Sequence, residues 1–247
     1  MKAVKRALRG LLVPAVAVLT LAVPGVASAD VVANWQMNEA RGAKTMADST
    51  GHGFTGAIGN RVTTGVFVSP GNGAYNFPGP AWGYDPGRLV TIPEVGKNDS
   101  RLDPGTSPYA VTVRFRTTAH EPNIIQKGQA GQTGGYWKLV LNHGWPRCHF
   151  RDSRGVTKAI GFVDGPEEYQ LNDNEWHTVR CERTATGVKV TINPGEPGAK
   201  SKFIRGTLGT IDNKRPFLLG GKLDCLMEDV GCDYMRGQID WVTVEKG

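Results

Sequence analysis

Most sequence signatures of enzymes are missing from this 247-residue chain. It contains no G-x-S-x-G elbow, no H-E-x-x-H motif and no G-x-x-x-x-G-K phosphate loop. An E-x-D-x-x-E pattern, which would place two carboxylates on one strand face for retaining glycoside hydrolysis, is also absent. Residues 51–56 fit G-x-G-x-x-G, but no strand-like segment precedes them, so the match is interpreted as chance in a glycine-rich chain. The sequence therefore favours a protein that is not an enzyme.

Long apolar runs are confined to the first 29 residues. Basic residues at positions 2–9, an apolar stretch at 11–23 and the small residues Ala27 and Ala29 form the three parts of a secretory signal. The apolar stretch is shorter than the roughly 20 residues that span a membrane. We therefore expect a signal peptide at 1–29, cleaved before Asp30, and no membrane insertion of the remainder. Residues 30–247 are expected to form one secreted, extracellular domain.

Excess positive charge is also small in that expected domain. Four of the 29 basic residues and none of the 23 acidic ones lie in residues 1–29, which leaves a formal net charge of +2. No run of lysine and arginine resembles a nucleic-acid-binding segment. Nucleic acid is therefore not an expected partner.

Cysteine is scarce but even in number. Neither C-x2-C spacing nor a histidine pair at i, i+4 occurs, which argues against a zinc site. Four cysteines in an exported chain predict disulfides, and three pairings are open. The spacing favours Cys225–Cys232, which closes a short loop, and Cys148–Cys181, which joins two expected strands.

No segment of ten or more residues after the signal shows a helical period, whereas a period of two is frequent. Alternation predicts strands around residues 111–116, 137–142 and 188–192. Further strands are expected at 31–37, 87–92, 146–152, 175–183 and 234–245. Many short strands separated by glycine and proline turns are typical of an all-β fold with two antiparallel sheets, a sandwich or jelly roll.

Four segments together suggest a family. They are Trp35–Glu39 before Asp48–Gly51, Val111–Arg116 before Ile125–Gly128, Leu171–Val179 before Cys181–Arg183, and Gly220–Lys222 before Tyr234–Val242. Their order resembles the laminin-G-like domain of the concanavalin A-like lectin/glucanase superfamily, with cysteines placed as in secreted actinobacterial members. The resemblance covers residues 30–247 and implies the jelly-roll sandwich of that family.

The resemblance implies a secreted, non-catalytic module that binds a glycan or an extracellular protein surface. Two alternatives remain open, because one fold serves many functions. The first is a glycoside hydrolase or polysaccharide lyase whose catalytic residues are dispersed in the sequence. The second is a structural or assembly protein of the cell surface. A monomer is expected in each case.

Aromatic residues in expected loops are the candidates for contacts to a sugar, because sugar rings stack their apolar faces on aromatic side chains. A neighbouring arginine supplies hydrogen bonds to hydroxyl groups. The candidate ligand-binding residues are Trp82, Tyr84, Tyr136, Trp145 and Arg151.

Calcium is the one cofactor that the resemblance makes plausible. Calcium takes six to eight oxygen ligands, and the best side-chain candidates are Glu39, Asp48 and Asp240. The alternative is that these carboxylates accept hydrogen bonds from backbone N–H groups. His177 is expected to be structural, with its ring tied to a backbone group at the start of a strand, because no triad partner accompanies it.

Overall fold

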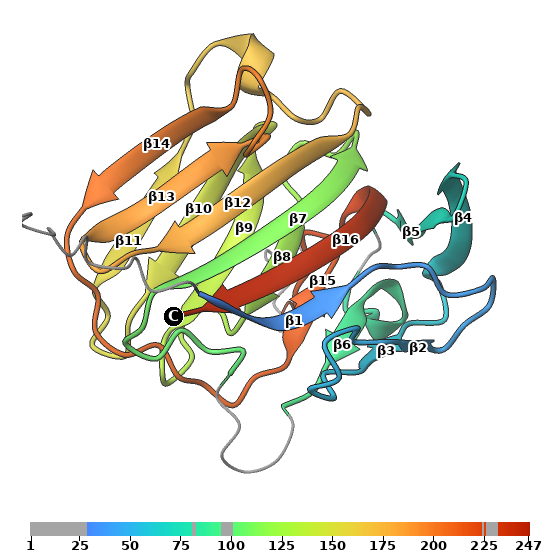
Figure 1. The fold of residues 1–247 in the computed structure, drawn as a ribbon, viewed down its shortest axis with the longest axis horizontal. Coiled ribbons are helices and arrows are strands. Elements are labelled where there is room, and N and C mark those ends of the chain that lie inside the picture. Colours follow the sequence, from blue (N-terminus) through green and yellow to red (C-terminus); the bar gives the residue numbers. More distant parts are fainter. Residues whose placement is uncertain (1–28, 81–82, 95–100, 224, 226–231) are drawn as a thin grey trace, which may run out of the picture.

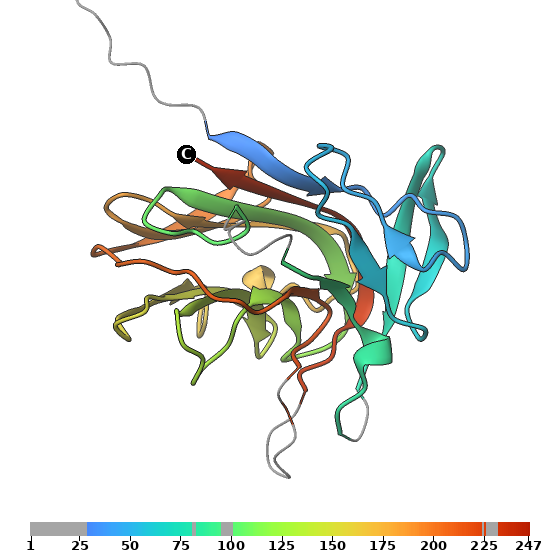
Figure 2. The same ribbon diagram turned by 90° about the horizontal axis from the view of Figure 1, so that it is seen from below.

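The computed structural model describes residues 29–80, 83–94, 101–223, 225 and 232–247. Two antiparallel sheets face each other across one hydrophobic core, and Figure 2 shows them edge-on as two layers. The prediction of an all-β sandwich is confirmed. The described part contains two single-turn 3-10 helices, η1 (Pro86–Arg88) and η2 (Glu167–Tyr169). It holds no helix that is both long and apolar enough to cross a membrane.

The first sheet, sheet A, is built around the C-terminal strand. Its order is β14 (Lys200–Arg205), β13 (Gly187–Ile192), β12 (His177–Arg183), β7 (Tyr109–Thr117), β16 (Arg236–Lys246), β5 (Asn72–Pro78) and β4 (Thr63–Ser69), and β1 (Asp30–Trp35) also pairs with β16. One edge of β16 is shared, because its beginning pairs with β5 and its end with β1. The first and last strands, β1 and β16, thus lie side by side (Figure 1).

The second sheet, sheet B, packs against sheet A. Its order is β11 (Thr157–Gly161), β10 (Trp145–Arg151), β9 (Tyr136–Asn142), β8 (Asn123–Lys127), β15 (Phe217–Leu219), β6 (Val90–Ile92), β3 (Gly56–Ile58) and β2 (Thr45–Met46). Of the predicted segment 87–92, only the last residues form a strand, because Pro86 begins the turn η1. Gly56 begins β3, so the G-x-G-x-x-G segment leads into a strand and not into a helix.

The alternating residues face the core as their period predicts. Val111, Val113 and Phe115 of β7 are fully buried, and so are the corresponding residues of β9 and β13. Trp35 and Trp137 meet Phe217 at ring-centroid distances of 5.2 and 5.0 Å, which places aromatic contacts at the centre of the sandwich.

Both disulfides favoured by the sequence are present. Cys148 of β10 and Cys181 of β12 join the two sheets through the core, with Cα atoms 5.6 Å apart. Cys225 and Cys232 pair before β16 and pack in a second, smaller apolar cluster with Leu89, Leu218 and Tyr234. One bridge therefore ties the layers together, and the other anchors the connection into the last strand.

Candidate binding site

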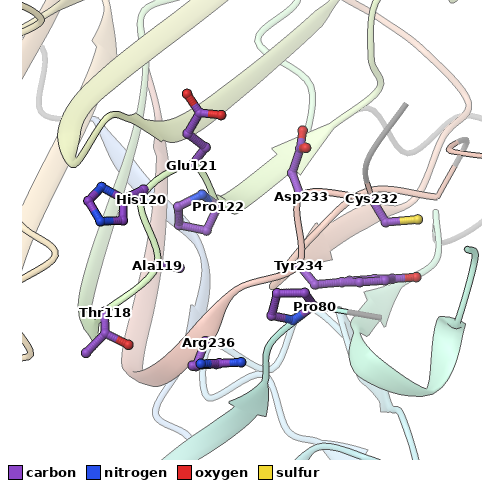
Figure 3. A pocket seen from close by; sticks show the side chains of 10 residues that line it. All are labelled: Pro80, Thr118, Ala119, His120, Glu121, Pro122, Cys232, Asp233, Tyr234 and Arg236. Atoms are coloured by element: carbon purple, nitrogen blue, oxygen red, sulfur yellow. The ribbon is translucent and has the colours of Figure 1, made fainter. Parts of the chain in front are cut away.

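One end of the sandwich carries a pocket between three connections. They are the segment just after β5, which contributes Pro80, the β7–β8 connection, and the segment that leads into β16. They meet there because β16 is antiparallel to both β5 and β7, so that Arg236 lies opposite Pro78 and Gly237 opposite Thr117. The pocket has a volume of about 390 Å³. We call it the rim pocket; its lining residues are Pro80, Thr118, Ala119, His120, Glu121, Pro122, Cys232, Asp233, Tyr234 and Arg236 (Figure 3).

The rim pocket combines flat apolar surfaces with polar groups. Pro80 contributes an exposed apolar ring, and the largely buried rings of Pro122 and Tyr234 line the wall. His120 and Arg236 contribute exposed nitrogen donors. Such a mixture suits a ligand that has both apolar faces and hydroxyl groups.

Asp233 is held rigidly in the wall of the rim pocket. Its backbone adopts a positive φ of 46°, and its carbonyl oxygen accepts the amide hydrogen of Asn123 at 2.9 Å. The carboxylate accepts from Lys222 Nζ at 2.9 Å and from Asn123 Nδ2 at 3.3 Å. These contacts connect the segment before β16 with the start of β8, and they engage one oxygen of the carboxylate.

Tyr234 lines the rim pocket but is only 5% exposed, and its hydroxyl is engaged by the protein. Its hydroxyl oxygen accepts the amide hydrogen of Asp85 at 2.6 Å, and Arg88 lies over its ring at 5.9 Å. Burial, followed by the negative charge of Asp85, raises the pKa of Tyr234 even though the Asp85 amide bond opposes the change. In Figure 3 the hydroxyl lies at the end of the ring away from His120. The phenol is therefore neutral near pH 7.

His120 and Glu121 form the outer edge of the rim pocket. The His120 carbonyl accepts the amide hydrogen of Gly144 at 2.8 Å, which positions the β7–β8 connection against the β9–β10 turn. The His120 ring lies 3.4 Å from Asn172 Nδ2, and Glu121 lies 3.5 Å from His143 Nδ1. Both side chains are exposed and available to a ligand.

The predicted ligand-binding residues do not converge at the rim pocket. Trp82 lies outside the described residues, and Tyr84 is 42% exposed near the segment that leads to η1. Tyr136 and Arg151 are directly opposite each other on the outer face of sheet B. Trp145 lies on the same face but at the other end of β10, six residues from Arg151 and therefore about 20 Å away.

The three candidate calcium ligands are engaged with protein partners. Glu39 accepts from the Ala47 amide at 2.7 Å and from the Tyr75 hydroxyl. Asp48 accepts from the amides of Asn34, Thr50 and Phe54. Asp240 is paired with Arg114. Among the described residues, no group of three or more histidine, cysteine or acidic side chains is arranged to hold a metal ion, so calcium stays a prediction.

His177 stands at the start of β12, as expected, but its predicted tie to a backbone group is wrong. Its Nε2 atom meets the Asp173 carboxylate oxygens at 2.9 and 3.1 Å. The loop 172–174 turns back at Asn174, which has a φ of 67°, and this turn brings the carboxylate to the ring. The role is still structural, because the pair closes the loop that enters the strand.

The rim pocket was missed because its residues carry no motif. The signal that identifies them is topological: residues just after β7 and just before β16 must meet wherever these strands pair in antiparallel fashion. The alternation predicts both strands but not that they are neighbours.

Comparison with known proteins agrees with this architecture. The model of the laminin G domain family matches residues 115–233. The mouse laminin alpha1 chain, domains LG4-5, superposes with a TM-score of 0.50 at 22% identity, over 74% of this chain and 45% of that one. The domain has a laminin G-like fold. No curated protein sequence matches the chain.

Bacterial toxin domains are also similar in structure to this laminin G-like domain. The botulinum neurotoxin serotype D ligand binding domain, solved in complex with N-acetylneuraminic acid, has a TM-score of 0.60 at 16% identity over 87% of this chain. The serotype G binding domain has a TM-score of 0.59 at 17% identity over 88% of this chain. The chain spans about half the length of these solved structures, 47% in both cases.

Proposed function

We propose that this chain is an exported, extracellular module that binds a glycan at the rim pocket and does not act as an enzyme. The rim pocket is the observation that carries the proposal. It offers the exposed ring of Pro80, with the largely buried rings of Pro122 and Tyr234 lining the pocket behind it, beside exposed polar groups from His120 and Arg236. A sugar ring has the same duality, since its C–H faces are apolar and its edge carries hydroxyl groups.

The similar structures support a binding role. One of them is a ligand binding domain in complex with N-acetylneuraminic acid, a sugar, and the present proposal extends glycan binding to this chain. A protein surface in the extracellular space is the alternative partner. The two disulfides support an extracellular location. We also propose that residues 1–29 are a signal peptide and that the protein is secreted, as in the actinobacterial members that its sequence resembles. The module is proposed to act as a monomer.

A polysaccharide lyase or glycoside hydrolase is the second candidate, because the rim pocket also brings together groups that such enzymes use. Glu121 and Asp233 are two carboxylates in one pocket, and Tyr234 lies there with His120 and Arg236. Two observations favour binding over catalysis. Asp233 is ion-paired with Lys222, and the pKa of Tyr234 is raised, whereas a catalytic base needs a pKa close to the operating pH.

A glycan array with residues 30–247 tests the proposal. We expect retention on a defined subset of glycans, and loss of that binding by about tenfold in the double variant His120→Ala/Arg236→Gln, which removes two polar contacts. Arg205→Gln, an exposed arginine on β14, is the matched control and keeps binding. A chelator arm tests whether Glu39, Asp48 and Asp240 contribute through calcium.

Enzyme activity is measured on the glycans that bind. Release of reducing ends, or absorbance from an unsaturated product, would replace the binding proposal with the second candidate. If that activity also disappears in Glu121→Gln or Tyr234→Phe, the rim pocket is the catalytic site.

A further inference from the structure

A lysine and two carboxylates meet inside the core where β8 ends. The Nζ atom of Lys127 lies 2.7 Å from Asp103 Oδ2 and 2.9 Å from Glu94 Oε1. The side chains of Lys127 and Asp103 are fully buried, and that of Glu94 is 12% exposed. We call these three residues the buried triad. None of them lines the rim pocket, so the triad is a separate feature of the fold.

Aromatic rings close over the lysine and keep water away from it. Lys127 lies directly opposite Trp137 of β9 on one side and opposite Phe217 of β15 on the other. Those two strands are about 10 Å apart across the sheet, yet the Trp137 and Phe217 rings meet at a centroid distance of 5.0 Å. The rings therefore lean towards each other across the lysine, which leaves its amine in dry surroundings.

The carboxyl group of Asp103 is held against the amine by the surrounding loops. Its Oδ1 atom accepts the amide hydrogen of Asn213 at 3.3 Å, and Lys127 donates to the Asn213 carbonyl at 2.7 Å. The neighbouring Leu102 carbonyl accepts the Tyr109 hydroxyl at 2.8 Å, which fixes the backbone just before Asp103. The two side chains thus approach each other in one fixed geometry.

The protonation of the buried triad suits a reaction between an acid and an amine. Burial raises the pKa of Asp103 to about 6, and a hydrogen bond with Glu94 acts in the same direction, although the charge of Lys127 opposes both. About a tenth of the Asp103 carboxyl groups are then protonated at pH 7. A proton that passes from Lys127 to Asp103 leaves a neutral amine and a neutral acid in contact, and these are the two forms that condense.

We propose that Lys127 and Asp103 condense into a side-chain amide, an isopeptide cross-link between β8 and the segment before β7. In this step Lys127 Nζ attacks Asp103 Cγ, and the new C–N bond replaces the bond from Cγ to one carboxyl oxygen. Glu94 accepts the proton that leaves Nζ and returns it to the departing hydroxyl group, which is released as water. The reaction needs no further reactant, because one amine and one acid give one amide and one water.

Two properties of the site favour the amide. Groups held in contact react as if they were highly concentrated, and effective molarities of about 10⁵ M or more are known for well-oriented pairs. The amide is also neutral, so its formation removes two charges whose burial is costly. The ion pairs of Lys127 are the starting state of the reaction, and they persist in every chain that has not condensed.

Intact mass spectrometry of residues 30–247, denatured and with both disulfides reduced, tests the proposal. The cross-linked chain is expected to be lighter than its sequence by about 18 Da, the mass of one water. Trypsin is then expected to leave residues 102–114 joined to residues 117–138, because it does not cleave after an acylated lysine. Tandem spectra of the joined peptides place the bond between Asp103 and Lys127.

Variants separate the reaction from the fold. Glu94→Gln keeps the size of the side chain but removes the proton acceptor, so condensation is expected to slow by about 100-fold and the full sequence mass to remain. Glu175→Gln, at an exposed glutamate, is the matched control and condenses like the parent. Lys222 and Asp233 form an internal control, since they are 2.9 Å apart but partly exposed and should stay unlinked.

The full sequence mass in the parent chain, with residues 117–127 recovered as a separate peptide, overturns the proposal. So does a loss of about 18 Da that maps to Asp164 and Gly165, because an aspartyl succinimide loses the same water. Equal condensation in Glu94→Gln overturns the role of Glu94 as proton carrier. The parent chain alone decides whether the amide forms, and glycan binding at the rim pocket does not enter this test.

Discussion

Single side chains in this fold differ in how their charge is set, and His149 and Asp152 are two extremes. His149 is partly buried on the outside of sheet B and also faces Lys138 and Arg147, so its charged form is disfavoured. Asp152, at the end of β10, is buried but accepts hydrogen bonds from the amides of Arg154, Val156 and Gly209 at 3.0, 2.9 and 2.7 Å. His149 therefore stays neutral and Asp152 stays ionised, each because of its surroundings.

His149 makes the fold sensitive to acid. Its pKa is about 3 in the folded chain against an ordinary value of 6.5, so the unfolded chain binds the additional proton as the pH falls through this interval. Its contribution to the free energy of unfolding is therefore lost at about 1.4 kcal/mol per pH unit below pH 6.5. His149→Gln should remove this slope in urea unfolding between pH 6.5 and 4. An unchanged slope, or an imidazole NMR titration near pH 6.5, contradicts the assignment.

Asp152 contributes stability with the same sign of pH dependence as His149, but in a more acidic interval. Burial alone would raise the pKa of its carboxyl, but the Arg154 side chain and the three amides lower it to about 2 from 3.8. The contribution of about 2 kcal/mol is present above pH 3.8 and is lost as the pH falls towards 2.

Asp152→Ala is expected to reduce the free energy of unfolding at pH 7 by about 2–4 kcal/mol, because buried amides lose an ionised acceptor. Arg154→Ala, which removes a side chain that is 66% exposed, should cost less than about 1 kcal/mol. Equal losses in the two variants would show that the ion pair and not the amide bonds carries the effect.

At the scale of elements, two cross-links hold the sandwich together. The Cys148–Cys181 bridge closes a separation of 33 residues between β10 and β12, whereas Cys225–Cys232 closes only 7. Loop-closure entropy grows with the length of the closed loop. The bridge between the sheets is thus the more stabilising of the two.

Replacing both Cys148 and Cys181 by alanine should lower the free energy of unfolding by about 3–4 kcal/mol. The corresponding change at Cys225 and Cys232 should cost about 2 kcal/mol. Guanidinium unfolding followed by tryptophan fluorescence measures both variants. A larger loss for the shorter loop would mean that packing in the Leu89–Leu218–Tyr234 cluster outweighs the entropy.

Lys127 connects β8 with two loops through buried ion pairs. Its Nζ atom lies 2.7 Å from Asp103, 2.9 Å from Glu94 and 2.7 Å from the Asn213 carbonyl, and the side chain is fully buried. Lys127→Met leaves the buried Asp103 carboxylate without its cation, and Glu94 with only Lys214 at 3.7 Å, and should cost about 3–5 kcal/mol. The double variant Lys127→Met/Asp103→Leu should recover much of this loss in denaturant unfolding. A single variant as stable as the parent would show that water replaces the lysine at no cost.

At the scale of the whole molecule, the sequence predicts the layers well and their arrangement poorly. The period of two predicts β7, β9 and β13 because one face of each is buried, and this physical cause acts locally. Strand order depends on contacts between distant segments, so the pairing of β1 with β16 is not visible in any local pattern. Short strands such as β2 and β15 are not predicted either, because two or three residues are too few to show a period.

The same distinction, between local patterns and contacts of distant segments, explains which parts of the candidate sites can be predicted from the sequence. The sequence suggests Tyr136, Trp145 and Arg151 as ligand contacts because they are aromatic or basic residues near expected turns. In the fold they lie on one sheet face because their strands are neighbours. The rim pocket joins residues around positions 80, 120 and 234, which only the folded sheet brings together. Residue types could therefore be predicted from the sequence, whereas the pocket that combines them could not.

The central claim, that the laminin G-like domain binds a glycan at the rim pocket, is tested most directly by NMR. Backbone amide shifts of residues 30–247 are recorded during titration with a glycan selected on the array. The account predicts that the shifts which change concentrate in residues 118–122 and 233–236, with the glycan recovered intact. Shifts confined to other surfaces, or conversion of the glycan during the titration, would contradict it.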